Sequence, residues 1–170
     1  MVGLTPENNI RPRENMKGDN TVIAGLNDLL TKELTAIDLY FLHSRMYNNW
    51  GLTKLFEKIS HERDDEIRHA DLLINRILFL EGLPNILARA PIQLEISTEK
   101  MIQQSLDYEI EVMKFIKGLI KTCEDKQDYD TRKLLQQLLK DTEEDHIYWC
   151  ETQINLIAKI GLPRYLQSQI

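Results

Sequence analysis

Two of the four histidines in this 170-residue sequence follow a glutamate by three positions. The pairs are Glu66 with His69 and Glu143 with His146. Residues three apart share one face of a helix, so each pair can offer a carboxylate oxygen and an imidazole nitrogen to the same ion. One such pair alone is usually a solvated helix surface in a chain with 28% charged residues. Two pairs, both on apolar helix faces, instead favour a metal site.

The hydrophobic pattern predicts four long helices. Apolar residues recur at alternating spacings of three and four, the pattern of a helix that buries one face. Gly82 and Gly161 are each followed by a proline two residues later, which marks the ends of the second and fourth helices. The helices are predicted over residues 20–49, 52–81, 97–124 and 130–160, with a short terminal helix after them.

The connections predict the topology. The first and second helices are joined by a few residues, as are the third and fourth, so each pair forms an antiparallel hairpin. The connection over residues 82–96 is longer. Fifteen extended residues reach about 50 Å, which is enough to run the roughly 45 Å length of a 30-residue helix. We therefore expect an all-α, ferritin-like four-helix bundle with one long crossover and a short C-terminal fifth helix.

Each of the other two helices carries one glutamate on its apolar face, Glu33 in the first and Glu109 in the third. Glu66 follows Glu33 by 33 residues, and Glu143 follows Glu109 by 34 residues. In each hairpin, both glutamates therefore lie about 25 Å from the turn, at a rise of 1.5 Å per residue. The Glu and His side chains are predicted to meet at the middle of the bundle.

Four carboxylates in a bundle core repel each other and lose hydration unless they are protonated or bind cations. Two divalent ions neutralise four carboxylates, and two neutral imidazoles complete the ligand set. Oxygen-rich ligation with imidazole suits iron or manganese, while zinc or cobalt fit the same ligand types. The sequence predicts a two-metal centre formed by Glu33, Glu66, His69, Glu109, Glu143 and His146.

The composition narrows the setting. A length of 170 residues with 42% hydrophobic residues fits one domain with a sizeable core. A net charge of -6 argues against a nucleic-acid partner. The two cysteines form no CxxC pair, so neither a disulfide scaffold nor a rubredoxin-type site is supported. Without an apolar N-terminal segment or a run of about 18 apolar residues, we expect a soluble, cytoplasmic protein with no membrane segment.

From Met16 to Ile170 the sequence resembles the bacterioferritins. The resemblance covers about nine tenths of the chain, and the segments that carry it read MKGDN, KELTAIDLYFLHSRMYNNWGL, RILFLEGLPN, HIYWCETQINLI and GLPRYLQSQI. The resemblance implies a 24-subunit cage for iron storage and detoxification, whose subunits oxidise Fe(II) at a di-iron site with dioxygen or peroxide. The implied ferroxidase reaction is 4 Fe(II) + O2 + 4 H⁺ to 4 Fe(III) + 2 H2O, and a ferredoxin-type protein is the implied reductant for release.

The resemblance also assigns roles to the six candidate ligands. Glu66 and Glu143 would bridge the two irons. The terminal ligands would be Glu33, His69, Glu109 and His146.

Three features depart from the family pattern. Ile67 stands where the family has the methionine that ligates a haem shared by two subunits, and a hydrocarbon side chain cannot be an axial ligand. This argues against haem b in a homo-oligomer and leaves a mixed cage with a haem-binding subunit as an alternative.

The segment KDTEEDH ends at His146 and is one residue longer than the family pattern. If the extra residue lies within the fourth helix, it re-phases the part of that helix upstream of Glu143. Residues 1–15 have no counterpart in the family. They are predicted to be a flexible extension of a di-iron domain over residues 16–170, with an over-long start before Met16 as the alternative.

Further residues have weaker assignments. Tyr40 lies two turns after Glu33 and resembles a family tyrosine that supplies an electron, although core packing explains it equally well. His61 and Asp65 resemble an iron relay on the inner wall of the cage, and a solvent-exposed pair explains them nearly as well. We assign packing roles to Trp149 and His43.

Two other functions stay open from the sequence. One is a non-storage di-iron peroxidase or oxygenase. The other is a structural subunit of a mixed bacterioferritin cage whose own site is inert.

Overall fold

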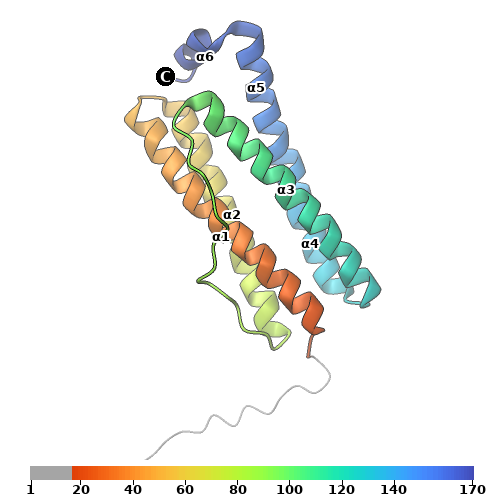
Figure 1. The fold of residues 1–170 in the computed structure, drawn as a ribbon. Helices are drawn as coiled ribbons and strands as arrows, with labels where there is room; N and C mark the ends of the chain where they lie inside the picture. Colours follow the sequence, from red (N-terminus) through yellow and green to blue (C-terminus); the bar gives the residue numbers. More distant parts are fainter. Residues whose placement is uncertain (1–16) are drawn as a thin grey trace, which may run out of the picture.

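The computed structural model describes residues 17–170 and shows a bundle of long helices (Figure 1). Within these residues there is no β-strand. The first three long helices are α1 (Asn20–Asn49), α2 (Thr53–Phe79) and α3 (Thr98–Asp125). The fourth is built from three consecutive segments: α4 (Tyr129–Asp141), the π-helical turn η1 (Thr142–Ile147) and α5 (Tyr148–Ile160). A short helix, α6 (Leu162–Ser168), ends the chain.

The predicted fold is confirmed, with helix boundaries within three residues of those expected. The predicted extension over residues 1–15 lies outside the described residues. The main difference is that the predicted fourth helix, 130–160, is interrupted by η1. A π-turn contains one residue more than an α-helical turn, and such turns often occur at functional sites.

Local interactions fix where the helices begin and end. The Asp19 side chain accepts a hydrogen bond of 2.8 Å from the Thr21 amide, which caps α1. Asp128 caps α4 in the same way by accepting from the Thr131 amide at 3.0 Å. Gly161 has a φ of 79°, a left-handed conformation that costs glycine little, and it separates α5 from α6.

The long crossover between α2 and α3 runs from one end of the bundle to the other, so that these two helices point the same way (Figure 1). Contacts with α1 hold it in place. The Asn85 amide donates to Asn27 Oδ1 at 2.7 Å, and the Ala90 amide donates to Thr35 Oγ1 at 2.9 Å. The crossover therefore packs along the bundle rather than leaving it.

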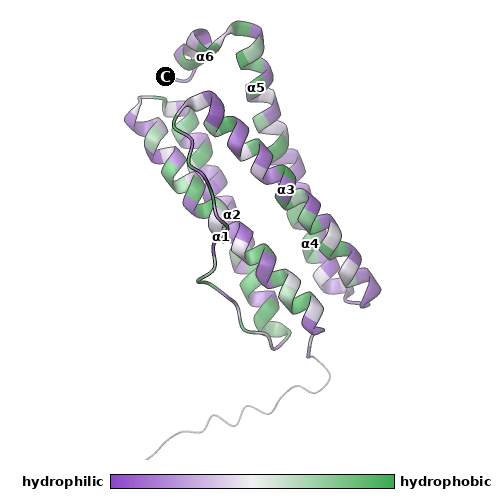
Figure 2. Ribbon diagram, in the orientation of Figure 1, coloured by the Kyte–Doolittle hydropathy of each residue, from purple (hydrophilic) through white to green (hydrophobic). Residues whose placement is uncertain are grey.

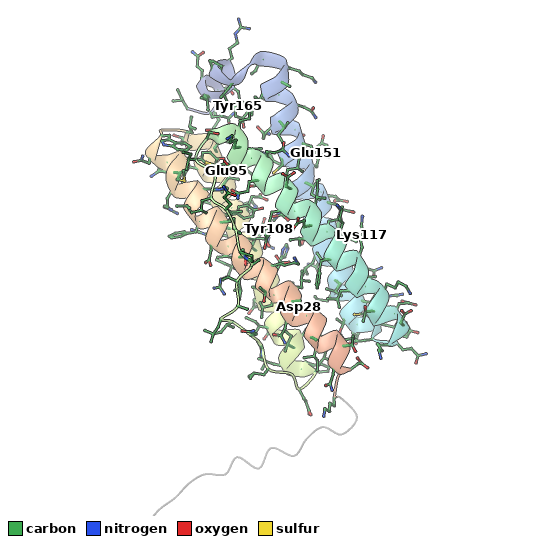
Figure 3. All side chains as sticks on the ribbon, viewed as in Figure 1. Asp28, Glu95, Tyr108, Lys117, Glu151 and Tyr165 are labelled. Atoms are coloured by element: carbon green, nitrogen blue, oxygen red, sulfur yellow. The ribbon has the colours of Figure 1, made fainter. Side chains whose placement is uncertain are left out.

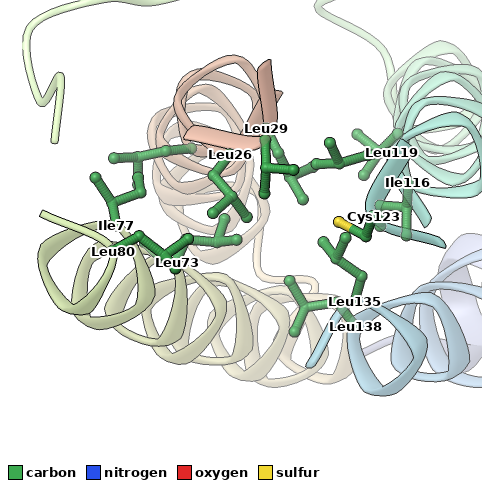
Figure 4. Close-up of a cluster of buried hydrophobic side chains, with 14 residues drawn as sticks. Leu26, Leu29, Leu73, Ile77, Leu80, Ile116, Leu119, Cys123, Leu135 and Leu138 are labelled. Atoms are coloured by element: carbon green, nitrogen blue, oxygen red, sulfur yellow. The ribbon is translucent and has the colours of Figure 1, made fainter. Parts of the chain in front are cut away.

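The core consists of two separate apolar clusters. One lies toward the α1 start and includes Leu26, Leu73 and Ile116 (Figure 4). The other lies toward the α1–α2 turn and includes Tyr47 and the α6 residue Tyr165. Hydrophilic and hydrophobic residues alternate around each helix, as a one-sided core requires (Figure 2). Among residues 17–170, none of the helices has the length and apolar character to cross a membrane.

Candidate metal centre

A polar layer separates the two apolar clusters. Its side chains come from α1, α2, α3 and η1, and each is at most 3% exposed. Five of the six predicted ligands belong to this layer: Glu33, Glu66, His69, Glu109 and His146. Such burial of ionisable groups is rare unless they are paired or bind cations.

The five side chains form two overlapping groups. Glu33, Glu66 and His69 bring one potential ligand atom each to within 4.8 Å of the others, and so do Glu66, Glu109 and His146. Glu66 belongs to both groups. Its Oε2 lies 3.1 Å from His69 Nδ1, and its Oε1 lies 2.9 Å from His146 Nδ1. One carboxylate therefore faces two adjacent places where a cation fits.

Both imidazoles are held from their outer side by another carboxylate. His69 Nε2 lies 3.4 Å from Asp141 Oδ2, and His146 Nε2 lies 3.1 Å from Glu62 Oε2. At His69 this contact has hydrogen-bond geometry, and a carboxylate bound at Nε2 orients the ring with Nδ1 toward the cluster. The ring nitrogens of His146 make no hydrogen bond within the described residues, so Glu62 acts on that ring through its charge. Sequence reasoning did not assign Glu62 or Asp141 to the site. For Glu62, a signal was present, since it lies four residues before Glu66 on the same face of α2.

The structure does not bring Glu143 into the cluster. Its side chain is 41% exposed, and Oε1 lies 2.7 Å from Lys117 Nζ. Lys117 belongs to α3 (Figure 3). The buried position is instead taken by Thr142, whose hydroxyl donates to the Leu138 carbonyl at 2.9 Å. The sixth predicted ligand therefore lies outside the cluster, and it belongs to η1, which overlaps the segment KDTEEDH.

Buried opposite charges shift the protonation of this layer. Burial and the neighbouring Glu66 charge hold the pKa of Glu33 well above its usual value. Burial also acts to raise the pKa of Glu66, but hydrogen bonding with Glu33 and the charge of His146 outweigh it, so that this pKa lies well below the usual value.

The pKa values of both histidines in the layer are raised. Burial lowers the pKa of His69, but hydrogen bonds with Glu33 and Glu66 overcome this and raise it to about 11. The pKa of His146 is likewise raised, against burial, by Glu109 and Glu66. Imidazolium protons thus partly neutralise the metal-free cluster, and a cation that binds there must displace them.

A family model for the ferritin-like domain matches residues 23–160. The chain belongs to the ferritin family. It is 53% identical over 155 residues to a protein named bacterial ferritin from Synechocystis sp.. The aligned residues cover 91% of this chain and 99% of the Synechocystis protein. This chain is 49% identical over 154 residues to a bacterial ferritin of Paramagnetospirillum magnetotacticum, covering 90% and 94%. A bacterioferritin of Mycolicibacterium paratuberculosis is 43% identical over 150 residues, covering 88% and 94%.

Tyr40 of this ferritin-like chain lies directly against the polar layer. Its hydroxyl donates a hydrogen bond to Glu109 Oε1, and its ring lies edge-on to His146 with the centroids 6.4 Å apart. Burial and the Glu109 charge raise the pKa of the phenol well above its usual value. The phenol is therefore held neutral beside the cluster, in a position that suits either of the roles considered for it.

The predicted inner-wall pair lies on another face of α2. His61 Nε2 is 3.5 Å from Asp65 Oδ2, and the His61 side chain is 68% exposed whereas that of Asp65 is 9% exposed. Asp65 also forms an ion pair with Arg68. It belongs to a third close group with Glu62 and His146, so Asp65 lies near the outer side of the metal centre.

Ile67 and Trp149 take different positions. Ile67 is 48% exposed and lines a surface pocket on α2 together with Arg68, Asp71 and Leu72. Trp149 is partly buried against the cluster that contains Tyr47, and Lys58 Nζ lies 5.7 Å from its ring centroid. These contacts are those of a packing residue.

His43 is buried away from the carboxylates. Burial lowers its pKa to about 4, with a smaller opposing effect from Gln104. The unfolded chain takes up this proton near pH 6.5 but the folded chain only near pH 4. Protonation of His43 in the unfolded chain alone should therefore lower the free energy of unfolding by about 2 kcal/mol between pH 8 and pH 5.

The measurement is urea unfolding of the metal-free protein at both pH values, compared with His43→Leu. The carboxylates titrate in both proteins, so the difference between their changes in free energy of unfolding reports on His43 alone. The variant is expected to lose less stability on acidification. Equal losses in the two proteins would contradict this prediction.

Proposed function

We propose that this chain is an iron-storage subunit with ferroxidase activity. In this proposal, two Fe(II) ions bind in the polar layer and are oxidised by dioxygen or peroxide, and the ferric product is deposited inside a cage. The observation that carries the proposal is the pair of overlapping, fully buried ligand groups that share Glu66. The bacterial ferritins to which the chain is similar support the storage role.

The chain's own residues supply three elements of such a reaction. Carboxylates compensate the positive charge that grows as Fe(II) becomes Fe(III). Asp141 at Nε2 of His69 would keep the Nδ1 atom of that ring directed at the ions, and the Glu62 charge would stabilise the His146 ring from its outer side. Tyr40, which donates a hydrogen bond to Glu109, would give up an electron to the oxidant. Glu143 is the remaining predicted ligand, and it would have to move inward to bind.

The oxidised iron would leave past His146 toward Asp65 and His61, which we propose as the inner-wall relay.

We also propose a 24-subunit cage in the cytoplasm. Contacts between its subunits would cover exposed apolar side chains on α1, α2 and the crossover, such as Phe41, Leu78 and Leu87. Since Ile67 cannot ligate haem, we propose that haem enters only through a partner subunit in a mixed cage.

One observation favours a second candidate function. Because Glu143 lies outside the cluster, a structural subunit of a mixed cage with an inert site is the alternative. A non-storage peroxidase or oxygenase has no comparable observation in its favour.

Titration with iron tests the proposal. Anaerobic Fe(II) should bind up to two ions per chain, and the initial rate of aerobic oxidation should rise with added iron until two per chain and then change slope. Mineral formation at higher loading should be seen as a growing ferric absorbance that stays in solution. Fewer than two bound ions, together with oxidation no faster than in protein-free buffer, would favour the inert subunit.

A further inference from the structure

In η1, the predicted ligand Glu143 lies one residue along the chain from the buried position, which Thr142 occupies. Thr142 is buried at the polar layer, and the next residue, Glu143, points to solvent and pairs with Lys117. Lys117 is itself 51% exposed, so this ion pair is held only weakly. Glu143 is therefore close to the metal centre and lightly restrained outside it.

Charge balance gives a reason for Glu143 to enter. The three carboxylates of the two groups are Glu33, Glu66 and Glu109, and they carry three negative charges against the four positive charges of two divalent ions. A net positive charge in a buried layer is costly. A first ion is well compensated, whereas a second one requires another carboxylate.

Besides Asp65, which pairs with His61 and Arg68, two carboxylates lie at the outer side of the histidines, and both are already engaged. Glu62 pairs with Lys58 through Oε1 and with His146 Nε2 through Oε2. Asp141 faces the Nε2 of His69, the side of the ring away from the cluster. Neither can move toward the Nδ1 side without releasing a histidine.

The π-turn offers a route that leaves the rest of the bundle in place. A π-turn holds one extra residue, and it can shift along a helix by local exchange of backbone hydrogen bonds. If it moves upstream of Glu143, this residue and His146 regain regular α-helical spacing and share one face. Helix α5 and most of α4 keep their packing in both arrangements.

We propose that η1 is a register switch: the second divalent cation draws Glu143 away from Lys117 and into the cluster, so that the two cations bind in order with unequal affinity. The proposal rests on the proposed function, because it assumes that two cations occupy this site. Thr142 and Lys117 act in it as positioning residues and do not touch the ions.

Two deletions of equal length separate this switch from a general effect of the π-turn. Deleting Thr142 removes the extra residue and places Glu143 at the buried position. Deleting the exposed Glu144 also removes the extra residue but leaves Thr142 buried and Glu143 outside. The probe is Co(II), added anaerobically, with its visible absorption and binding heat recorded for each ion bound.

In the unmodified chain, we expect a tight first and a weaker second binding step. Deletion of Thr142 should tighten the second step about tenfold or more, while deletion of Glu144 should weaken it without changing the first. Equal second-step affinities in the two deletion variants would overturn the proposal. If the unmodified chain binds no Co(II) at all, the proposed function fails instead.

Substitutions test the same switch without altering chain length. Lys117→Met should tighten the second step about 2- to 5-fold, as expected for loss of an exposed ion pair. Lys121→Met is the matched control, because Lys121 lies one turn further along α3 and pairs with Asp125. Glu143→Gln should weaken only the second step, by about 10-fold or more. An unchanged second step in both Lys117→Met and Glu143→Gln would also overturn the proposal.

Discussion

Replacing Glu66 by alanine is expected to lower the initial rate of Fe(II) oxidation by about 100-fold or more. Among residues 17–170, Glu66 is the one carboxylate that reaches both His69 and His146, at 3.1 Å and 2.9 Å, and it belongs to both ligand groups. Loss of even an outer partner of a metal ligand commonly costs 10- to 100-fold, and loss of a shared ligand should cost at least as much. Stopped-flow absorbance of ferric species at two Fe(II) per chain measures the effect.

The matched control is Glu57→Ala, which removes an exposed glutamate from the same helix. Its oxidation kinetics should equal those of the unmodified chain. Circular dichroism should show the same helix content for all three proteins, so that a slow Glu66→Ala reaction is not the result of unfolding. Unchanged kinetics in a folded Glu66→Ala protein would refute the assignment of the metal centre.

Removing bound metal is expected to lower the free energy of unfolding by several kcal/mol. In the metal-free chain, buried carboxylates are neutralised only by raised protonation and by two imidazolium groups. A ligand that binds only the folded state at 100 times its dissociation constant adds about 2.7 kcal/mol. For a domain of this size, each kcal/mol raises the melting temperature by roughly 2–4 °C.

Anaerobic Co(II) at such a concentration should therefore raise the melting temperature by about 5–10 °C, and a chelator should reverse the change. Differential scanning fluorimetry is sufficient to detect it. The same addition to Glu66→Ala should leave the melting temperature nearly unchanged. An equal rise in both proteins would indicate that Co(II) stabilises the fold from somewhere other than the polar layer.

The positions of α1, α2 and α3 were predictable because each of these helices keeps a regular α-helical repeat throughout. The spacing of apolar residues and the glycine and proline signals fixed α1, α2 and α3 to within three residues. The long crossover was predictable from length alone. The convergence of Glu33, Glu66, His69 and Glu109 followed from counting residues to each turn, because α1, α2 and α3 are regular helices. His146 also reaches the cluster, although it lies within η1.

The same counting placed Glu143 at mid-bundle, and there the structure differs. The extra residue in the sequence could be counted, but not located within the fourth helix, since backbone hydrogen bonding decides where a π-turn forms. The outer partners Glu62 and Asp141 were missed for another reason. Whether a carboxylate faces Nδ1 or Nε2 of a histidine depends on side-chain rotation, which residue spacing does not specify.

The division of the apolar core by the polar layer has a consequence for cooperativity. The buried apolar residues form two clusters, and among the described residues Tyr108 packs against both. In the metal-free chain we therefore expect the half around Leu26 and the half around Tyr165 to be coupled mainly through Tyr108 and the helix backbones. Bound ions would tie these backbones together at their midpoints. Metal-free protein should then open as two semi-independent foldons in native-state hydrogen exchange, and loaded protein as one.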